Sequence, residues 1–288
     1  MLIHFVHGEK GGVGKSWFAR LLVDCCLSSG WETITLVESD SSNPDVGRYF
    51  PEITEKIFFS EDDKRSYDVD RIFQLAETRP VLVNLPAQVD APLNDWIERN
   101  GLLDEDFDEL EIYKWFVCTG EPDSVALFKN STQALNGKIR HVLVKNMGRT
   151  GAHELTWNRL ATDNELLEFV KTHNVVEMTL DPLHAEDADI IVVKGFSFDA
   201  AINSPLGGSV SKLAKRRLKV YREKVFTSIR GTGLLSTDLY LKHLSLDNST
   251  QQTEQAPTSP VDDSTEAAQA EAALGATSGK GKKGKSAA

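Results

Sequence analysis

The chain has 288 residues, a hydrophobic content of 40% and a formal net charge of −11. An acidic protein of this composition is not a bulk polyanion binder, so any contact with nucleic acid must come from a local basic patch. The chain has no apolar run of membrane-spanning length and no long apolar stretch at its N-terminus, so we expect a cytoplasmic protein without a membrane span or secretory signal.

Composition divides the chain into a body and a tail. Residues 247–288 contain only Val261 and Leu274 as sizeable apolar side chains, and they end in a lysine-rich stretch. Such a segment cannot bury enough surface to offset the entropy of ordering it, so we predict a disordered, low-complexity tail. Residues 1–246 have a length that suits one α/β domain.

Short apolar runs alternate with helical patterns along the body. The candidate strands are nearly continuous apolar runs, which is typical of strands covered by helices on both faces. They span residues 2–6, 33–38, 81–85, 112–118, 141–146 and 175–180, and the candidate helices span 15–29, 67–78, 91–100, 123–135, 163–173 and 209–228. Because each connection is long enough for a crossover helix, we predict a doubly wound, mostly parallel α/β sheet with helices on both faces.

A glycine-rich loop follows the first candidate strand and opens a helix. It reads Gly8-Glu9-Lys10-Gly11-Gly12-Val13-Gly14-Lys15-Ser16. Backbone N–H groups of such a loop wrap phosphates, the lysine at its end reaches the β- and γ-oxygens, and the following hydroxyl holds Mg²⁺. The strand before it and the helix after it favour this P-loop over a chance Lys-Ser in a glycine-rich turn. The predicted ATP contacts are Gly11, Gly12, Val13, Gly14, Lys15, Ser16 and Trp17, with Ser16 as a metal ligand.

The loop departs from the ordinary P-loop pattern at two positions. Glu9 stands where that pattern has its first glycine, and a second lysine, Lys10, lies five residues before Lys15. With this deviant Walker A motif the chain resembles the ParA/MinD-type ATPases. The resemblance implies an ATP·Mg²⁺-dependent homodimer in which Lys10, as a catalytic residue beside Lys15, reaches the phosphates of the partner subunit. Such a lysine would neutralise transition-state charge as an arginine finger does.

Two further segments match the switch regions of this family. Asp40, just after the second candidate strand, matches the acid that positions the attacking water and lies near Mg²⁺; a helix cap is the alternative role. Asn84 stands at the end of the third strand, where relatives have the Walker B aspartate. An amide can hydrogen-bond a Mg²⁺-bound water but adds no negative charge. We therefore expect weak Mg²⁺ binding or slow hydrolysis, partly compensated by Asp40 or Glu38.

Two positions match the part of the family's site that binds the base. Asn146, at the end of the fifth candidate strand, matches an asparagine that hydrogen-bonds adenine, and an amide offers the donor and acceptor that this edge needs. An ordinary turn asparagine is the alternative. Pro182 lies in the Asp181-Pro182-Leu183 segment that fits the family's loop over the base.

The last candidate helix is strongly basic. Its apolar stripe is predicted to pack on the body and consists of Leu213, Ala214, Leu218, Tyr221 and Val225. The cations then lie on the exposed side, where they either pair with acids of the body or contact DNA phosphates without sequence choice, as partition-class relatives do. The candidate DNA contacts are Lys212, Lys215, Arg216, Lys219 and Arg222.

The sequence therefore predicts a slowly hydrolysing ATP-dependent switch of the ParA type, with ATP and Mg²⁺ as cofactors. The alternatives are a nucleotide-gated adaptor with little hydrolysis, or an ATP-dependent small-molecule synthetase. Resemblance to plasmid-borne members implies a role in DNA partition, stability or conjugative transfer, with an unidentified stimulating or cargo protein.

The acidic segment 104–111 is either a solvated loop or a docking site for a basic partner. Segment 234–244 has too few basic residues for the membrane helix of MinD-like relatives.

Overall fold

The computed structural model describes residues 1–8, 10–41, 44–59, 67–148, 151–203, 210–235, 238, 240 and 241. The predicted tail, 247–288, lies outside this part of the chain, as does Glu9 of the phosphate loop. Among the described residues, no helix is both long enough and apolar enough to cross a membrane.

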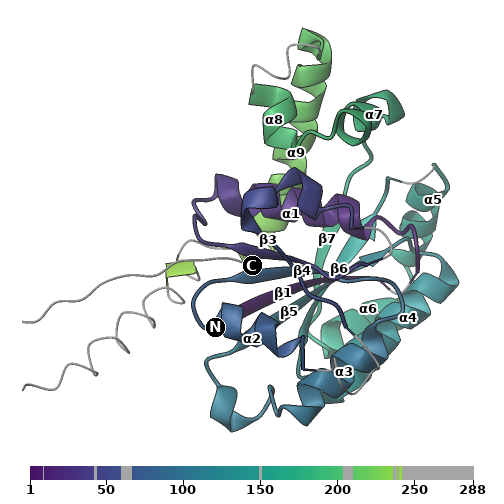
Figure 1. The fold of residues 1–288 in the computed structure, drawn as a ribbon. Helices are drawn as coiled ribbons and strands as arrows, with labels where there is room; N and C mark the ends of the chain where they lie inside the picture. Colours follow the sequence, from purple (N-terminus) through teal and green to yellow (C-terminus); the bar gives the residue numbers. More distant parts are fainter. Residues whose placement is uncertain are drawn as a thin grey trace, which may run out of the picture.

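The described strands form one parallel sheet in the order β3-β2-β4-β1-β5-β6-β7 (Figure 1). Their bounds are β1 Leu2–His7, β2 Thr35–Glu38, β3 Thr54–Lys56, β4 Val81–Asn84, β5 Glu111–Cys118, β6 Arg140–Asn146 and β7 Val176–Leu180. Six of them lie where the apolar runs predict strands. No apolar run predicts β3, because this strand has only three residues, all polar, and pairs at the sheet edge with β2.

Helices cover both faces of the sheet, so the predicted doubly wound α/β fold is confirmed (Figure 1). The α-helices are α1 Lys15–Ser28, α2 Asp70–Ala76, α3 Asp90–Arg99, α4 Pro122–Gln133, α5 Gly151–Leu160, α6 Asn164–Thr172, α7 Ala185–Lys194, α8 Phe198–Asn203 and α9 Lys212–Gly231. Short 3₁₀ helices span Gly47–Tyr49, Pro51–Ile53, Glu105–Phe107 and Ala134–Gly137. The sequence analysis did not identify α5, α7 and α8.

Successive side chains of a strand pack into two different hydrophobic cores, one on each face of the sheet. On β1, Leu2 and Val6 pack toward α1, whereas Ile3 and Phe5 pack toward α2 and α3 on the other face. A third cluster joins β5 and β6 to α4, α5 and α6. This alternation, with period two, decides which face of the sheet each polar side chain at a strand end will occupy.

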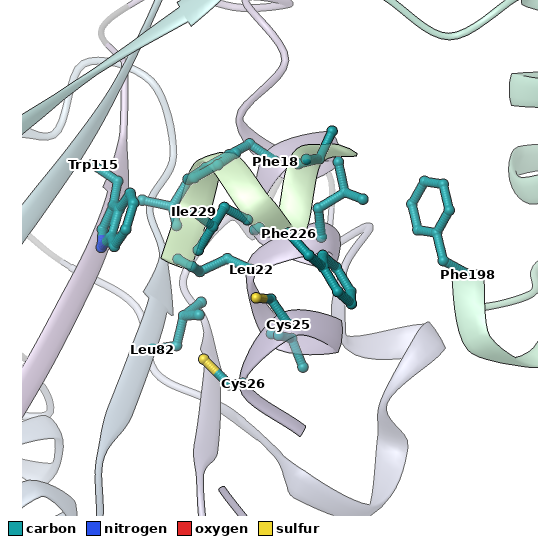
Figure 2. Packing of buried hydrophobic residues seen from close by; sticks show 14 of the residues in the cluster. Phe18, Leu22, Cys25, Cys26, Leu82, Trp115, Phe198, Phe226 and Ile229 are labelled. Carbon is teal, nitrogen blue, oxygen red and sulfur yellow. The ribbon is translucent and has the colours of Figure 1, made fainter. Parts of the chain in front are cut away.

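The core on the α1 face joins α1 to helix α9. Phe18 and Leu22 of α1 pack with Phe226 and Ile229 of α9 in the same buried cluster, together with Trp115 of β5 (Figure 2). The two adjacent cysteines of α1 are buried there as free thiols. The helix that begins with the phosphate loop is therefore fixed between the sheet and α9.

The face of α9 that packs on the body differs at one position from the predicted apolar stripe. Ala214, Leu218, Tyr221 and Val225 are buried as predicted. The side chain of Leu213, however, is 73% exposed, so its assignment to the buried face was wrong. It lies in the first turn of the helix beside Ala214, and only one of two adjacent helical positions can face the core there.

Candidate nucleotide-binding site

The phosphate loop lies at a point where the sheet changes winding direction. Strands β1 and β4 are neighbours, and the helix that follows each of them covers an opposite face of the sheet. In open α/β sheets such a point leaves a crevice at the carboxyl ends of the strands, where ligands bind. The loop between β1 and α1 occupies this position.

Two glycines of the loop are required by the surrounding structure. A Cβ atom on Gly8 would lie 2.9 Å from the carbonyl oxygen of Val117, and Gly14 adopts a φ of +103° at the start of α1. A side chain at Gly14 would also lie 2.7 Å from Nδ2 of Asn146. The loop therefore packs closely on β5 and β6 with its backbone in a conformation that favours glycine.

The first turn of α1 is suited to binding an anion. Gly14 is the N-cap, no side-chain hydrogen bond caps this end of the helix, and no acid lies in its first turn. Lys15 is buried, with Nζ 3.3 Å from the carbonyl oxygen of Lys10, and Ser16 is half-buried next to it. The backbone N–H groups at the start of an α-helix and the positive end of its dipole favour a negatively charged ligand here.

Asn146 holds the phosphate loop against strand β6. Its Nδ2 donates a hydrogen bond of 2.7 Å to the carbonyl oxygen of Val13, and its Oδ1 accepts one of 2.8 Å from the backbone N–H of Gly148. Both ends of the buried amide therefore have partners in the protein. Its predicted contact with adenine stays a prediction, while the structure gives Asn146 a role in shaping the loop.

Lys10 forms an ion pair within its own chain. Its Nζ lies 2.9 Å from Oδ2 of Asp123, in the first turn of α4. The hydrogen bond between them raises the pKa of Lys10 and lowers that of Asp123. The sequence analysis did not find Asp123, because 113 residues separate it from Lys10 and no motif contains it.

Glu38 and Asn84 form a buried pair at the carboxyl ends of β2 and β4. The two residues are opposite each other in the parallel register, and Asn84 Nδ2 donates a hydrogen bond of 2.8 Å to Glu38 Oε1. The other carboxylate oxygen, Oε2, accepts from the backbone N–H groups of Val46 at 2.9 Å and Gly47 at 3.2 Å. Burial raises the pKa of Glu38, and these hydrogen bonds oppose the shift.

The segment after β2 is anchored to the body at several points. Asp45 forms ion pairs with Arg20 of α1 and with Arg48, and the guanidinium of Arg20 lies over the ring of Tyr49. Asp40 lies two residues beyond β2, at the same edge of the sheet as the phosphate loop, and is half-buried. Val46, and not Asp40, is the N-cap of the next helix in the described part of the chain, the 3₁₀ helix Gly47–Tyr49.

A partly buried ion pair connects the start of α3 to strand β5. Lys114 Nζ lies 2.9 Å from Oδ1 of Asp90 and 3.2 Å from the hydroxyl of Ser131. His7, the last residue of β1 before the loop, lies 3.5 Å from the same Asp90 oxygen. Burial, followed by the charge of Lys114, lowers the pKa of His7 to about 3, so the imidazole is neutral at physiological pH.

A cavity of about 720 Å³ opens next to the loop segments after β6 and β7. Met147, Gly148 and Pro182 line one side of it, and residues of α7 and α9 line the other. Pro182 therefore lines a cavity, while its predicted place over a base stays a prediction. Trp17 points elsewhere: its indole donates a hydrogen bond of 2.9 Å to the hydroxyl of Tyr221 and packs on Phe198.

The chain is similar to one curated protein and to several solved structures. No protein-family model matches the chain. Protein MobD of Acidithiobacillus ferrooxidans is 27% identical over 220 residues, which cover 75% of this chain and 92% of that protein. This identity is too low to assign the chain to a family.

Similarity to solved structures is also distant. The MinC:MinD cell division complex of Aquifex aeolicus is 10% identical with a TM-score of 0.46, covering 78% of this chain and 95% of that one. A plasmid partition protein from Borrelia burgdorferi is 17% identical with a TM-score of 0.41, covering 77% and 98%. At these values the likeness does not assign a function, which therefore rests on the site itself.

Proposed function

We propose that this protein is an ATP-binding, slowly ATP-hydrolysing switch that forms a homodimer when ATP is bound and acts in the partition, stability or transfer of DNA. The observation that supports it best is the phosphate loop: a strand, a tightly packed glycine loop and an uncapped helix that begins with the buried Lys15. These are the parts that bind a nucleoside triphosphate in P-loop proteins.

The residues present fit a triphosphate together with Mg²⁺. Lys15 and the backbone N–H groups of residues 11–17 would hold the phosphates, and the hydroxyl of Ser16 would hold the metal ion. Asn84 Oδ1 is buried and has no hydrogen-bond partner among the described residues, so it can accept a hydrogen bond from a water of the metal ion. Mg²⁺ would neutralise charge on the phosphates. Asp40, half-buried at the same edge of the sheet, would orient the attacking water.

The position of Lys10 supports the proposed dimer. In the single chain, Lys10 is held by Asp123 at the surface, with 36% of its side chain exposed. A second subunit that presents its own bound nucleotide to this surface would offer Lys10 a phosphate instead of a carboxylate. Because ATP then binds the dimer better than the monomer, ATP binding favours dimerisation and hydrolysis reverses it.

The basic face of α9 supports contact with DNA. Lys212, Arg216 and Lys219 are exposed, and together with Lys215 they form no ion pair with the described part of the chain. By contrast, Arg222 is paired with Asp199 and Glu223 and only 11% of its side chain is exposed. We therefore place the DNA contact on the four unpaired cations and leave Arg222 as an internal support of α9.

The experiment that tests this function is ATP turnover with Mg²⁺, measured with and without non-specific double-stranded DNA at two salt concentrations. Lys15→Ala serves as the control that removes the phosphate-binding lysine. We expect turnover that is raised by DNA, lost at the higher salt concentration because the contact is electrostatic, and absent in Lys15→Ala. Turnover that is insensitive to Lys15→Ala would contradict the proposal.

A second candidate is a nucleotide-gated adaptor with little or no hydrolysis. The amide of Asn84 favours it, because position 84 adds no charge to a metal site. The exposed apolar side chains of Leu213 and Val220, which lie on α9 among the cations, also suit a protein partner. Measurable ATP binding with a near-zero rate, unchanged by DNA, would support the adaptor. Release of ADP stimulated by a small metabolite, again without a DNA effect, would instead indicate a synthetase.

A further inference from the structure

The pairing with Glu38 determines the orientation of the Asn84 amide. A carboxylate only accepts hydrogen bonds, so it draws the NH₂ group of Asn84 toward itself. Asn84 Nδ2 lies 2.8 Å from Glu38 Oε1, and Oδ1 of the same amide is buried without a partner among the described residues. The carboxylate of Glu38 thus holds the Asn84 amide so that its Oδ1, a hydrogen-bond acceptor, is directed away from Glu38.

This acceptor lies on the face of the sheet that α1 covers. Leu36 on β2 and Leu82 on β4 belong to the core cluster on that face. Because side chains alternate along a strand, Glu38 lies on the same face as Leu36, and Asn84 lies on the same face as Leu82. Glu38 and Asn84 are the last residues of their strands. Helix α1 begins with Lys15 and Ser16 at this edge of the sheet.

Glu38 is itself held in one orientation by the backbone that follows β2. Its Oε2 accepts hydrogen bonds from the N–H groups of Val46 and Gly47, and the N–H of Asp40 also donates to this carboxylate. Three backbone donors therefore require an acceptor at position 38. The geometry leaves Oε1 facing Asn84.

We propose that Glu38 is a positioning residue for the metal site: it supplies from β2 the negative charge that position 84 lacks, and it fixes Asn84 with Oδ1 as a free acceptor for a metal-bound water. The inference rests on the proposed function as a Mg²⁺-dependent nucleotide switch, and it concerns residues of that same site.

Substitutions at positions 38 and 84, singly and together, test this role of Glu38. In Glu38→Gln, the new amide must keep its oxygen toward the N–H groups of Val46 and Gly47, so its NH₂ group meets the NH₂ group of Asn84. To avoid two opposed donors Asn84 must turn, and a donor then replaces the free acceptor. In Asn84→Asp, two acceptor-only carboxylates meet. The double variant Glu38→Gln/Asn84→Asp restores one donor, one acceptor and one charge.

The experiment measures the affinity for ADP by calorimetry, with Mg²⁺ and with EDTA, for the wild-type protein, both single variants and the double variant. The ratio of the two affinities reports the effect of Mg²⁺. Loss of an outer partner of a metal site costs about 10- to 100-fold in metal affinity. We expect Glu38→Gln to lose the Mg²⁺ effect by a factor in this range while keeping its affinity for ADP in EDTA. The double variant should recover most of the effect.

Two further measurements make the result specific. Glu55→Gln, on the neighbouring strand β3, changes a carboxylate that pairs with Arg71 at the surface and should leave the Mg²⁺ effect unchanged. Thermal unfolding of the four proteins without nucleotide tests the pair itself: each single variant should lower Tm, and the double variant should be more stable than the sum of the single effects predicts.

The outcomes separate this inference from the proposed function. If the wild-type protein binds ADP but Glu38→Gln retains the full Mg²⁺ effect, or if the double variant recovers neither the Mg²⁺ effect nor stability, the positioning role of Glu38 is wrong and the nucleotide switch stands. If the wild-type protein binds no nucleotide with or without Mg²⁺, the proposed function fails, and the role of Glu38 fails with it.

Discussion

Lys10 and Asp123 of the same chain form an ion pair, with Nζ and Oδ2 2.9 Å apart. In the proposed function, Lys10 contacts the nucleotide that is bound by the partner subunit, but here its ammonium group is paired with Asp123. If the proposed dimer forms, this ion pair must break before Lys10 can reach a phosphate across the interface, so Asp123 would compete with dimerisation.

Asp123→Asn should make dimerisation easier. The pair is exposed, and surface ion pairs contribute little free energy, so we expect the ATP concentration for half-maximal dimerisation to fall by only about two- to fivefold. Analytical ultracentrifugation across an ATP titration measures this change. Asp95→Asn is a matched control, because Asp95 pairs with Arg99 at the surface of α3. Identical titrations for Asp123→Asn and wild type would show that the pair does not compete.

Asn146→Ala should disturb the phosphate loop. The substitution leaves the carbonyl of Val13 and the N–H of Gly148 without their partner, which costs about 1–3 kcal/mol of the free energy of unfolding. ATP and GTP should both bind more weakly, and by the same factor, because in the proposed function the loop contacts the phosphates, which the two nucleotides share. Chemical denaturation and nucleotide titration measure the two effects, with the exposed Asn130→Ala on α4 as control. A loss confined to ATP would favour the predicted contact with adenine instead.

The unpaired cations of α9 should determine the salt dependence of DNA binding. Each phosphate contact that is lost lowers the slope of log affinity against log salt by about 0.9. The triple variant Lys212→Ala/Arg216→Ala/Lys219→Ala should therefore lower the slope by about two to three for the ATP-bound protein, measured by fluorescence anisotropy with DNA of unrelated sequences. Lys171→Ala, an exposed lysine of α6 on the other face of the sheet, should leave the slope unchanged. An unaltered slope in the triple variant would place any DNA contact elsewhere.

Asp24 should make the protein less stable as the pH rises. Its carboxyl group is buried in α1, and burial raises its pKa from 3.8 to about 7, although the N–H of Phe198 donates a hydrogen bond to it. The folded state therefore retains a proton that the unfolded state releases, so stability is lost between about pH 4 and pH 7. Each unit of pKa shift corresponds to about 1.4 kcal/mol.

Asp24→Asn removes this dependence and keeps an acceptor for Phe198. We expect its Tm to exceed that of the wild-type protein by several degrees at pH 8, and the difference to shrink toward pH 4. Differential scanning calorimetry at both pH values checks this, with the exposed Asp106→Asn as control. A Tm difference that is equal at both pH values would show that Asp24 does not titrate as its burial indicates.

The main features of the fold could be predicted from sequence because they depend on local patterns. Apolar runs covered on both faces mark six of the strands, and the phosphate loop is a set of consecutive residues between a strand and a helix. Strand β3 could not be predicted, because the polar residues Thr54–Lys56 form a strand only through pairing with β2. The exposure of Leu213 likewise depends on how α9 rotates against the core, which the periodicity of a short basic segment does not fix.

The sequence by itself determined which residues form the loop and predicted its chemistry: Lys15 and Ser16 follow a glycine run, and a second lysine, Lys10, lies five residues earlier. Only the tertiary structure decided which side chains those residues meet. Asp123 holds Lys10, Asn146 holds the loop, and Glu38 orients Asn84. The physical reason is that hydrogen bonds and ion pairs between different strands and helices depend on the order and register of the sheet, and no local pattern in the sequence specifies either.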